Sequence, residues 1–326
     1  MKFLALSLGI AVAANAAAAD LLAVSTAPVG DLPRGVSFSA TAFAADDFIA
    51  AKDIDDHWSQ PASPRSGRNL AVAFGRAGMD YTGHGWSVGV FARGDAFGKT
   101  NRDSIEVFQA AADLLQLLDS DRRYGLDYEF TGFSAYGLRL ALALPLASET
   151  VSGSVALNLL KADRLRVERV VGEVVVEDGK ANIHGVRTLL YDGLDYTSPL
   201  APNPGRSDFR PATREDGDVG YGYALDFALR WQASPELRVD LAVNDLLGKL
   251  SWKNVPLLTQ RVDVDGISAT QWPTRPGGEA SFRNASRYQD VDLDLDPRMR
   301  LAATWSRDAL VLGTSVSARS GVVLPE

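Results

Sequence analysis

Residues 219–231 alternate without interruption between large apolar side chains and side chains that are small or charged. Because successive side chains of a β-strand point to opposite faces, this pattern predicts a strand with one continuous apolar face. Aromatic residues stand at both ends of that face and aliphatic residues in its middle, an order typical of a strand that faces lipid. The face consists of Val219, Tyr221, Tyr223, Leu225, Phe227, Leu229 and Trp231. The segment favours a β-barrel that lies in a membrane.

Eight further segments show the same period of two, so the sequence predicts nine membrane strands. Within one of them the apolar positions change phase near Gly75, which predicts a β-bulge. The eight segments are 36–42, 70–81, 86–90, 136–142, 151–159, 237–243, 299–305 and 310–318. The predicted fold class is all-β, a transmembrane antiparallel up-and-down β-barrel of about 10–12 strands.

Short and long connections alternate along these strands. The short ones are 82–85, 145–150, 232–236 and 306–309, and the long ones are 46–68, 98–134, 163–218 and 251–298. Bacterial barrels have short periplasmic turns and long extracellular loops, so the first strand is expected to run outward. The aromatics agree with this direction, since one group lies beside the short turns and the other near the long loops. They are Tyr81, Trp86, Trp231 and Trp305 in the first group, and Tyr136, Tyr221 and Tyr223 in the second.

The amino-terminal residues have the three parts of a secretory signal. A basic Lys2 precedes an apolar run, and small residues follow up to Ala19. We expect a signal peptide over 1–19, a periplasmic segment over 20–34 and the barrel over 35–326. The chain has no cysteine, which excludes a lipoprotein anchor and disulfides, and its net charge of −8 argues against nucleic acid as a partner. The predicted location is the outer membrane.

Nine strands make an odd number, whereas bacterial single-chain barrels have an even one. Either a strand lies hidden in a long connection, or a closing strand lies beyond residue 326. The second explanation is favoured, because the chain lacks the terminal aromatic strand that barrel assembly machinery reads, and because an open edge in lipid leaves backbone groups unpaired. The expected partners are therefore outer-membrane lipid and that assembly machinery, while the oligomeric state is undetermined.

Two long connections contain structure of their own. Residues 103–120 predict an amphipathic helix capped by Asp103, which either narrows the mouth of the barrel or packs its apolar side on neighbouring loops. Residues 163–176 and 181–191, joined by the turn 177–180, predict a hairpin that extends beyond the bilayer.

Catalytic chemistry finds little support in the residue pattern. The three histidines are His57 and His184 in long connections and His84 in a short turn. Outer-membrane proteases need aspartates beside a histidine at the outer rim, and residues 55–57 offer that composition without a specific spacing. Outer-membrane phospholipases need a serine and a histidine in membrane strands, and no histidine lies in a predicted membrane strand. We predict no catalytic residue, no cofactor and no enzyme activity, with an outer-membrane hydrolase kept as an alternative.

Four carboxylates alternate along one segment: Asp290, Asp292, Asp294 and Asp296. Carboxylates bind calcium, so this segment is a weak candidate metal site. The spacing matches no calcium loop, and a solvated strand face is the favoured interpretation. No metal ion is predicted.

Charges of both signs occupy the inward positions of the predicted strands. They are Arg93, Arg139, Asp226, Arg230, Arg238, Asp240 and Arg300. In a water-filled lumen such side chains select which solutes pass. In a narrow lumen they neutralise one another and fill the interior.

Residues 243–248 (VNDLLG) and 296–301 (DPRMRL) resemble stretches of fatty-acid-transporter-like and porin-like barrels of Gram-negative outer membranes. The resemblance is one of architecture, spans nearly the whole mature chain and implies uptake of small solutes. It carries no substrate residue across, and the chain lacks the amino-terminal plug of the fatty-acid transporters. The leading hypothesis is a channel or uptake barrel. The alternatives are a closed structural barrel whose loops bind a partner, and a secreted soluble β protein.

Overall fold

The computed structural model describes residues 28–46, 64–112, 118–119, 121–192, 219–268, 283–308, 310–319 and 322–325. The predicted signal peptide, most of connection 46–68 and His57 lie outside these ranges. A short 3-10 turn, η1 (Val29–Asp31), precedes the strands, and one helix, α1 (Arg102–Ala112), follows β3. The strands are β1 (Gly35–Asp46), β2 (Arg68–Thr82), β3 (Trp86–Asn101), β4 (Arg122–Ala143), β5 (Val151–Glu177), β6 (Lys180–Asp192), β7 (Gly220–Gln232), β8 (Leu237–Ser268), β9 (Arg283–Asp294), β10 (Arg298–Arg307), β11 (Leu310–Arg319) and β12 (Val322–Pro325).

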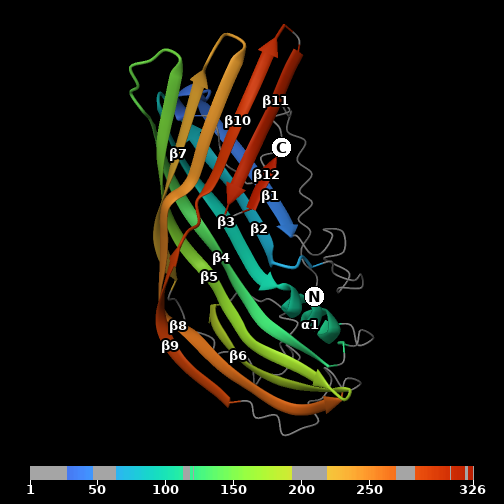
Figure 1. The fold of residues 1–326 in the computed structure, drawn as a ribbon. Coiled ribbons are helices and arrows are strands. Elements are labelled where there is room, and N and C mark those ends of the chain that lie inside the picture. Colours follow the sequence, from blue (N-terminus) through green and yellow to red (C-terminus); the bar gives the residue numbers. More distant parts are fainter. Residues whose placement is uncertain are drawn as a thin grey trace.

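All described strands belong to one antiparallel sheet of twelve strands, which confirms the predicted fold class at that level. At two places in the sheet, two short strands follow one another along the edge of the same long strand. β6 and β7 both lie between the long strands β5 and β8, and β9 and β10 both pair with one edge of β8. β7 and β10 lie toward the end with the short turns, whereas β6 and β9 lie toward the opposite, distal end (Figure 1). Among the described residues no ladder joins β1 to β11 or β12, so the sheet curls without closing.

The long connections contain more strand than the sequence pattern predicts. β3 and β4 occupy most of 98–134, β5 and β6 extend through 163–192, and β8 and β9 occupy much of 251–298. The predicted hairpin is confirmed, with Asp178 and Gly179 both at positive φ, as a two-residue type I′ turn requires. The strand ladder therefore continues well past the apolar belt.

The apolar face changes sides along the strands. In β2, Val72 and Phe74 point inward and are buried, whereas Met79 and Tyr81 point outward and are exposed. The pairing of β2 with β3 runs unbroken, so the predicted bulge near Gly75 is wrong. The apolar positions of β2 change phase for another reason. In the distal half of the sheet the inner face is apolar, whereas in the half nearer the short turns the outer face is apolar.

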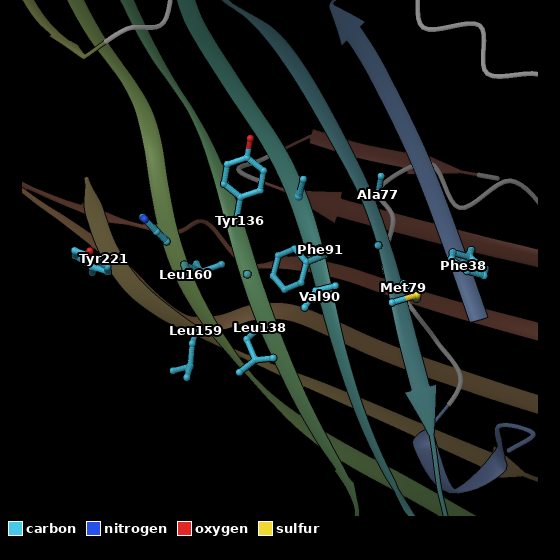
Figure 2. A pocket seen from close by; sticks show the side chains of 14 residues that line it. Phe38, Ala77, Met79, Val90, Phe91, Tyr136, Leu138, Leu159, Leu160 and Tyr221 are labelled. Carbon is cyan, nitrogen blue, oxygen red and sulfur yellow. The ribbon is translucent and has the colours of Figure 1, made fainter. Parts of the chain in front are cut away.

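The outward side chains of the half nearer the short turns form a broad exposed apolar belt. Residues such as Phe38, Met79 and Leu138 from adjacent strands all belong to it (Figure 2). Six aromatics are exposed on it, namely Tyr81, Trp86, Tyr136, Tyr221, Tyr223 and Trp231. The rings of Tyr81 and Trp86 lie 5.6 Å apart beside a short turn. A belt of this size far exceeds the apolar patches of ordinary soluble surfaces.

The interior of the distal half is packed with apolar side chains. The larger cluster gathers residues from β3, β4, β5, β7, β8, β9 and the link after β9, with Trp252 at its centre and fully buried. Its buried members are Phe91, Phe133, Ala135, Leu160, Ala162, Leu165, Ala224, Leu250, Trp252, Val255, Val291 and Leu295. Distal to it, Glu168 accepts hydrogen bonds from Arg166 and Arg187, all three buried. The distal half of the sheet thus buries a packed apolar core and, beside it, an ion-pair group.

Helix α1 lies beside the distal ends of β3 and β4 (Figure 1). Val107 is fully buried against Tyr124 of β4 and Val174 of β5. The expected cap is wrong: Asn101, not Asp103, accepts the hydrogen bond from the backbone N–H of Ser104. Asp103 instead accepts from the backbone N–H of Gly125. The helix thus packs its apolar side on the strands rather than on loops.

No described helix is long and apolar enough to cross a bilayer.

Two tryptophans test the change of apolar face. Trp252 points inward and is fully buried, whereas Trp231 points outward and is about half exposed. We expect Trp252→Ala to lower the free energy of unfolding by about 3–5 kcal/mol, because it leaves a cavity in a packed core. Trp231→Ala should cost much less in detergent micelles, since detergent replaces the lost contacts. Guanidinium unfolding followed by tryptophan fluorescence and circular dichroism measures both. Equal losses would contradict the assignment of faces.

Candidate functional site

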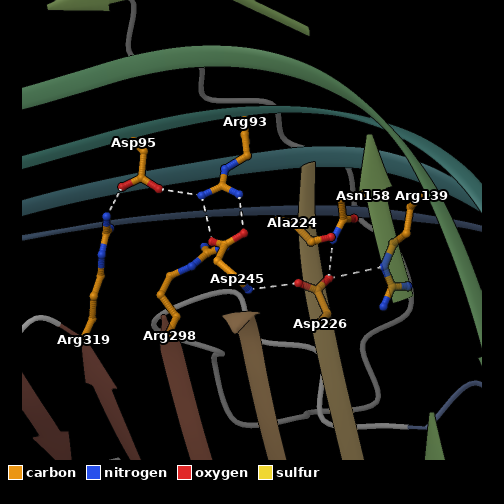
Figure 3. Close-up of polar contacts among 9 residues, drawn as sticks. All are labelled: Arg93, Asp95, Arg139, Asn158, Ala224, Asp226, Asp245, Arg298 and Arg319. Atoms are coloured by element: carbon orange, nitrogen blue, oxygen red, sulfur yellow. Dashed lines mark hydrogen bonds and ion pairs between the residues drawn. The ribbon is translucent and has the colours of Figure 1, made fainter. Parts of the chain in front are cut away.

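A cluster of five buried charges joins distant strands across the interior (Figure 3). Arg93 makes a bidentate pair with Asp245, with Nη–Oδ distances of 2.8 and 3.0 Å, and also donates to Asp95 at 2.8 Å. Arg298 donates to Asp245 at 2.8 Å, and Arg319 pairs with the other oxygen of Asp95. All five side chains are at most 7% exposed. We call these residues the central cluster.

The central cluster links strands that are not neighbours in the sheet. Arg93 and Asp95 lie on β3, Asp245 on β8, Arg298 on β10 and Arg319 on β11. Between β3 and β8 the sheet order places β4, β5 and β7. The pairs Arg93–Asp245 and Arg319–Asp95 therefore cross the curled sheet from wall to wall, whereas Arg298–Asp245 joins the neighbouring strands β10 and β8.

Asp245 reaches the interior through an irregularity of the backbone. It has a φ of 56°, and the β7–β8 pairing shifts register between Leu225 and Phe227. In consequence Asn244 and Asp245, although consecutive, are both buried. The backbone N–H of Asp245 donates to Asp226 at 3.1 Å, which stabilises the bulged conformation.

Aromatic rings complete the surroundings of the arginines. The guanidinium carbon of Arg298 lies 4.0 Å from the ring centroid of Phe74, and that of Arg93 lies 5.3 Å from the centroid of Phe133. Such contacts compensate buried cations in part for the loss of water. The cluster is thereby enclosed by apolar side chains on its distal side.

Asp226 is the centre of a second group of inward polar residues. It accepts a hydrogen bond from Asn158 at 2.8 Å and pairs with Arg139 at 3.7 Å. Because Asp226 also binds the backbone of Asp245, this group and the central cluster form one network.

A third group lies at the short-turn end. Asp240 is buried between Arg230 at 2.6 Å and Arg238 at 2.9 Å. Arg230 also pairs at 3.0 Å with Asp31 of η1, which accepts a further bond from Ser152. Val29 of η1 packs on the inner side of β4 and β5. The amino-terminal segment, expected to provide no plug, thus places one short turn at this end of the interior.

The predicted lumen residues all lie on the inner face, and six of the seven belong to these groups. The seventh, Arg300, is buried and donates to Ser315 at 3.1 Å. Sequence reasoning missed Asp95, Asp245, Arg298 and Arg319. Strict alternation assigns Asp245 to the outer face, and Arg298 and Arg319 stood at or beyond the predicted strand ends. Their role in selecting solutes stays a prediction.

The acidic row of β9 is neutralised by lysines on the outer face. Lys253 pairs with Asp290 at 2.7 Å, and Lys249 pairs with Asp292 at 2.8 Å. The hydrogen bond from Lys253 holds the pKa of Asp290 below its ordinary value, and that from Lys249 does the same for the pKa of Asp292. Within the described ranges no three acidic or histidine side chains converge as a metal site would require.

His184 lies in β6, a strand of the hairpin predicted within the long connection 163–218. Its Nδ1 contacts Asp263 of β8, and its Nε2 lies 3.4 Å from Asp265. All three side chains are substantially exposed. The group is a cross-strand polar contact on the rim of the distal end.

The central cluster yields a stability prediction. Asp245→Asn removes the carboxylate that Arg93 and Arg298 share, so two buried arginines lose charge compensation. We expect a loss of about 3–5 kcal/mol in the free energy of unfolding. Adding Arg298→Met to this variant should restore part of the loss, because it removes the surplus cation.

The matched control is Asp292→Asn, which breaks an exposed pair with Lys249. Exposed pairs contribute little, so its unfolding midpoint in detergent should stay near that of the parent. If Asp245→Asn behaves like this control, the buried pairs do not hold the strands together.

Comparison of the chain with protein-family models, with curated proteins and with solved structures gives no match in any of the three.

Proposed function

We propose that this protein is an outer-membrane β-barrel with a closed interior, and that its distal end is a binding surface outside the cell. The observation that carries the proposal is the central cluster, in which buried ion pairs bridge opposite walls of the sheet. A membrane location accounts for the exposed apolar belt, and a closed interior accounts for the packed core beyond it.

The belt supports the membrane location. Its outward residues are aliphatic in the middle and aromatic at both edges, as in strands that cross a bilayer. Beyond the belt, the outer face carries charged pairs such as Lys253 with Asp290 and Lys249 with Asp292, which belong in water. In lipid the free edges of β1 and β11 are costly, so closure of the barrel is part of the proposal.

The distal end is the proposed binding surface because the strands there extend past the belt and stay rigid. The β5–β6 hairpin is backed by the apolar core and by α1, so its outer face is presented on a fixed scaffold. That face carries polar groups, including His184 and Asp263. Surface-binding barrels need such a rigid, water-exposed platform.

The channel for small solutes is the second candidate. It is favoured by the inner wall near the short turns, where charged residues alternate with small ones. Arg139 pairs with Asp226, Arg230 and Arg238 share Asp240, and Arg230 also pairs with Asp31. Arg300 and Arg76 add positive charge to this wall, which would favour anionic solutes.

Lipid quenching tests the membrane location. Variants that keep only Trp231 or only Trp252 are placed in bilayers of brominated lipid. Bromine quenches tryptophan at contact, so we expect strong quenching of the outward Trp231 and weak quenching of the buried Trp252. A soluble secreted protein would show no quenching of either residue, would extract without detergent and would not shift its gel mobility on heating.

Conductance in planar bilayers separates the two candidate functions. The closed barrel predicts no steady current from the native protein, because the central cluster blocks the interior. The double variant Arg93→Ala, Asp245→Ala removes the bridging pair and should produce current if the barrel still folds. Steady anion-selective current from the native protein, reduced in Arg139→Ala or Arg230→Ala, would instead establish the channel. Far-ultraviolet circular dichroism of every variant checks folding.

A further inference from the structure

A hollow of about 730 Å³ lies on the outer face of the sheet, over β1 to β5 and β7. Large outward side chains surround it, among them Phe38, Val90 and Leu159 (Figure 2). Its volume falls in the range of small-molecule sites, about 300–1,000 Å³. Nearly all of its lining is apolar, so a hydrocarbon chain suits it.

Small residues give the hollow its depth. Ala77 and Ala92 lie side by side in the β2–β3 register, and Gly78 and Gly137 adjoin them. A side chain at Gly137 would collide with the Phe91 ring, which fills the inner side of the sheet at this point. Arg76 covers that ring from within, 4.1 Å from its centroid. The floor is therefore closed from the interior and open only to the outside.

A cation stands at the distal edge of the hollow. Lys161 lies between Tyr136 and Tyr221 on the neighbouring strands, in direct register with both. In the described part of the chain Lys161 has no carboxylate partner. Lys249, beside Tyr223 at the same edge of the belt, differs because it pairs with Asp292. Lys161 is thus an exposed positive charge set between two phenol groups at the end of an apolar hollow.

We propose that this hollow binds one phosphate-bearing lipid of the surrounding membrane, with an acyl chain in the hollow and the phosphate on Lys161. The lysine stem follows the apolar surface and delivers its ammonium group to the headgroup level, where the two tyrosines also lie. Charge complementarity selects an anionic lipid over a zwitterionic one. The inference rests on the proposed membrane location and names a lipid partner for the outer face.

Native mass spectrometry of the detergent-purified protein measures the lipid preference. The probes are dimyristoyl-phosphatidylglycerol, which is anionic, and dimyristoyl-phosphatidylcholine, which is zwitterionic. We expect the native protein to bind one phosphatidylglycerol molecule about fivefold more tightly than phosphatidylcholine, the preference that one lysine near an anionic surface confers. Lys161→Gln should abolish the preference, and Lys161→Arg should retain it.

Two variants separate the parts of the site. Lys249→Gln is the matched control and should keep the preference, because its ammonium group is already paired with Asp292. Ala92→Phe fills the hollow and should weaken the binding of both lipids. Millimolar inorganic phosphate should not displace the bound lipid if the acyl chain contributes. Full displacement by phosphate, an unchanged preference in Lys161→Gln, or an equal loss in Lys249→Gln would each overturn the lipid site.

The quenching of Trp231 by brominated lipid distinguishes the failure of this inference from the failure of the proposed function. If Trp231 is quenched and phosphatidylglycerol shows no preference, only the lipid site is refuted. If Trp231 is not quenched, the membrane location and the lipid site both fail.

Discussion

The bidentate pair between Arg93 and Asp245 is the interaction on which the rest of the structure depends. It is the centre of the cluster that ties β3 to β8, β10 and β11 across the interior. Buried charges are costly unless every one is paired, so the cluster tolerates only an arrangement of strands that brings all five groups together. The curl of the sheet and the strand register bring all five charged side chains to one level of the interior.

The backbone around Asp245 shows how strongly the pairing constrains the chain. A non-glycine residue at positive φ costs of order 1–3 kcal/mol. This cost is accepted in β8 because the irregular conformation turns Asp245 inward and lets Asp226 bind its N–H. The same bulge accommodates the shift in the β7–β8 pairing. Local strain, register and charge pairing are thus coupled at one point of the strand.

The central cluster also marks the level at which the sheet changes environment. On the short-turn side, apolar residues face outward and the interior holds ion pairs. On the distal side, apolar residues face inward around Trp252, and charged pairs such as Lys253 with Asp290 occupy the outer face. The same strands run through both halves. In β5 a register shift at Asp163 separates the outward Leu157 from the inward Leu165. A packed distal half is the physical basis for proposing a closed barrel.

The alternation of residues predicted most of the belt strands and the inward position of the seven lumen charges named from the sequence. The regular alternation ends at the level where the apolar residues change from the outer to the inner face. The distal parts of the strands were therefore predicted as loops. The outer position of the lysines that neutralise Asp290 and Asp292 was not predictable, because pairing of β8 with β9 joins residues about 40 positions apart. The hollow with Lys161 needed the same kind of information, since its lining comes from six strands.

The sequence by itself determined the class of the fold, because a period of two requires strands and an apolar face requires something apolar to cover it. It also determined that charges of both signs would meet inside. Only the tertiary structure decided which charges pair and whether the interior is open. Asp245 turns inward against the local alternation, and its partners Arg93 and Arg298 come from strands far away in the chain. Such contacts depend on how the sheet curls, and short-range periodicity carries no information about that curl.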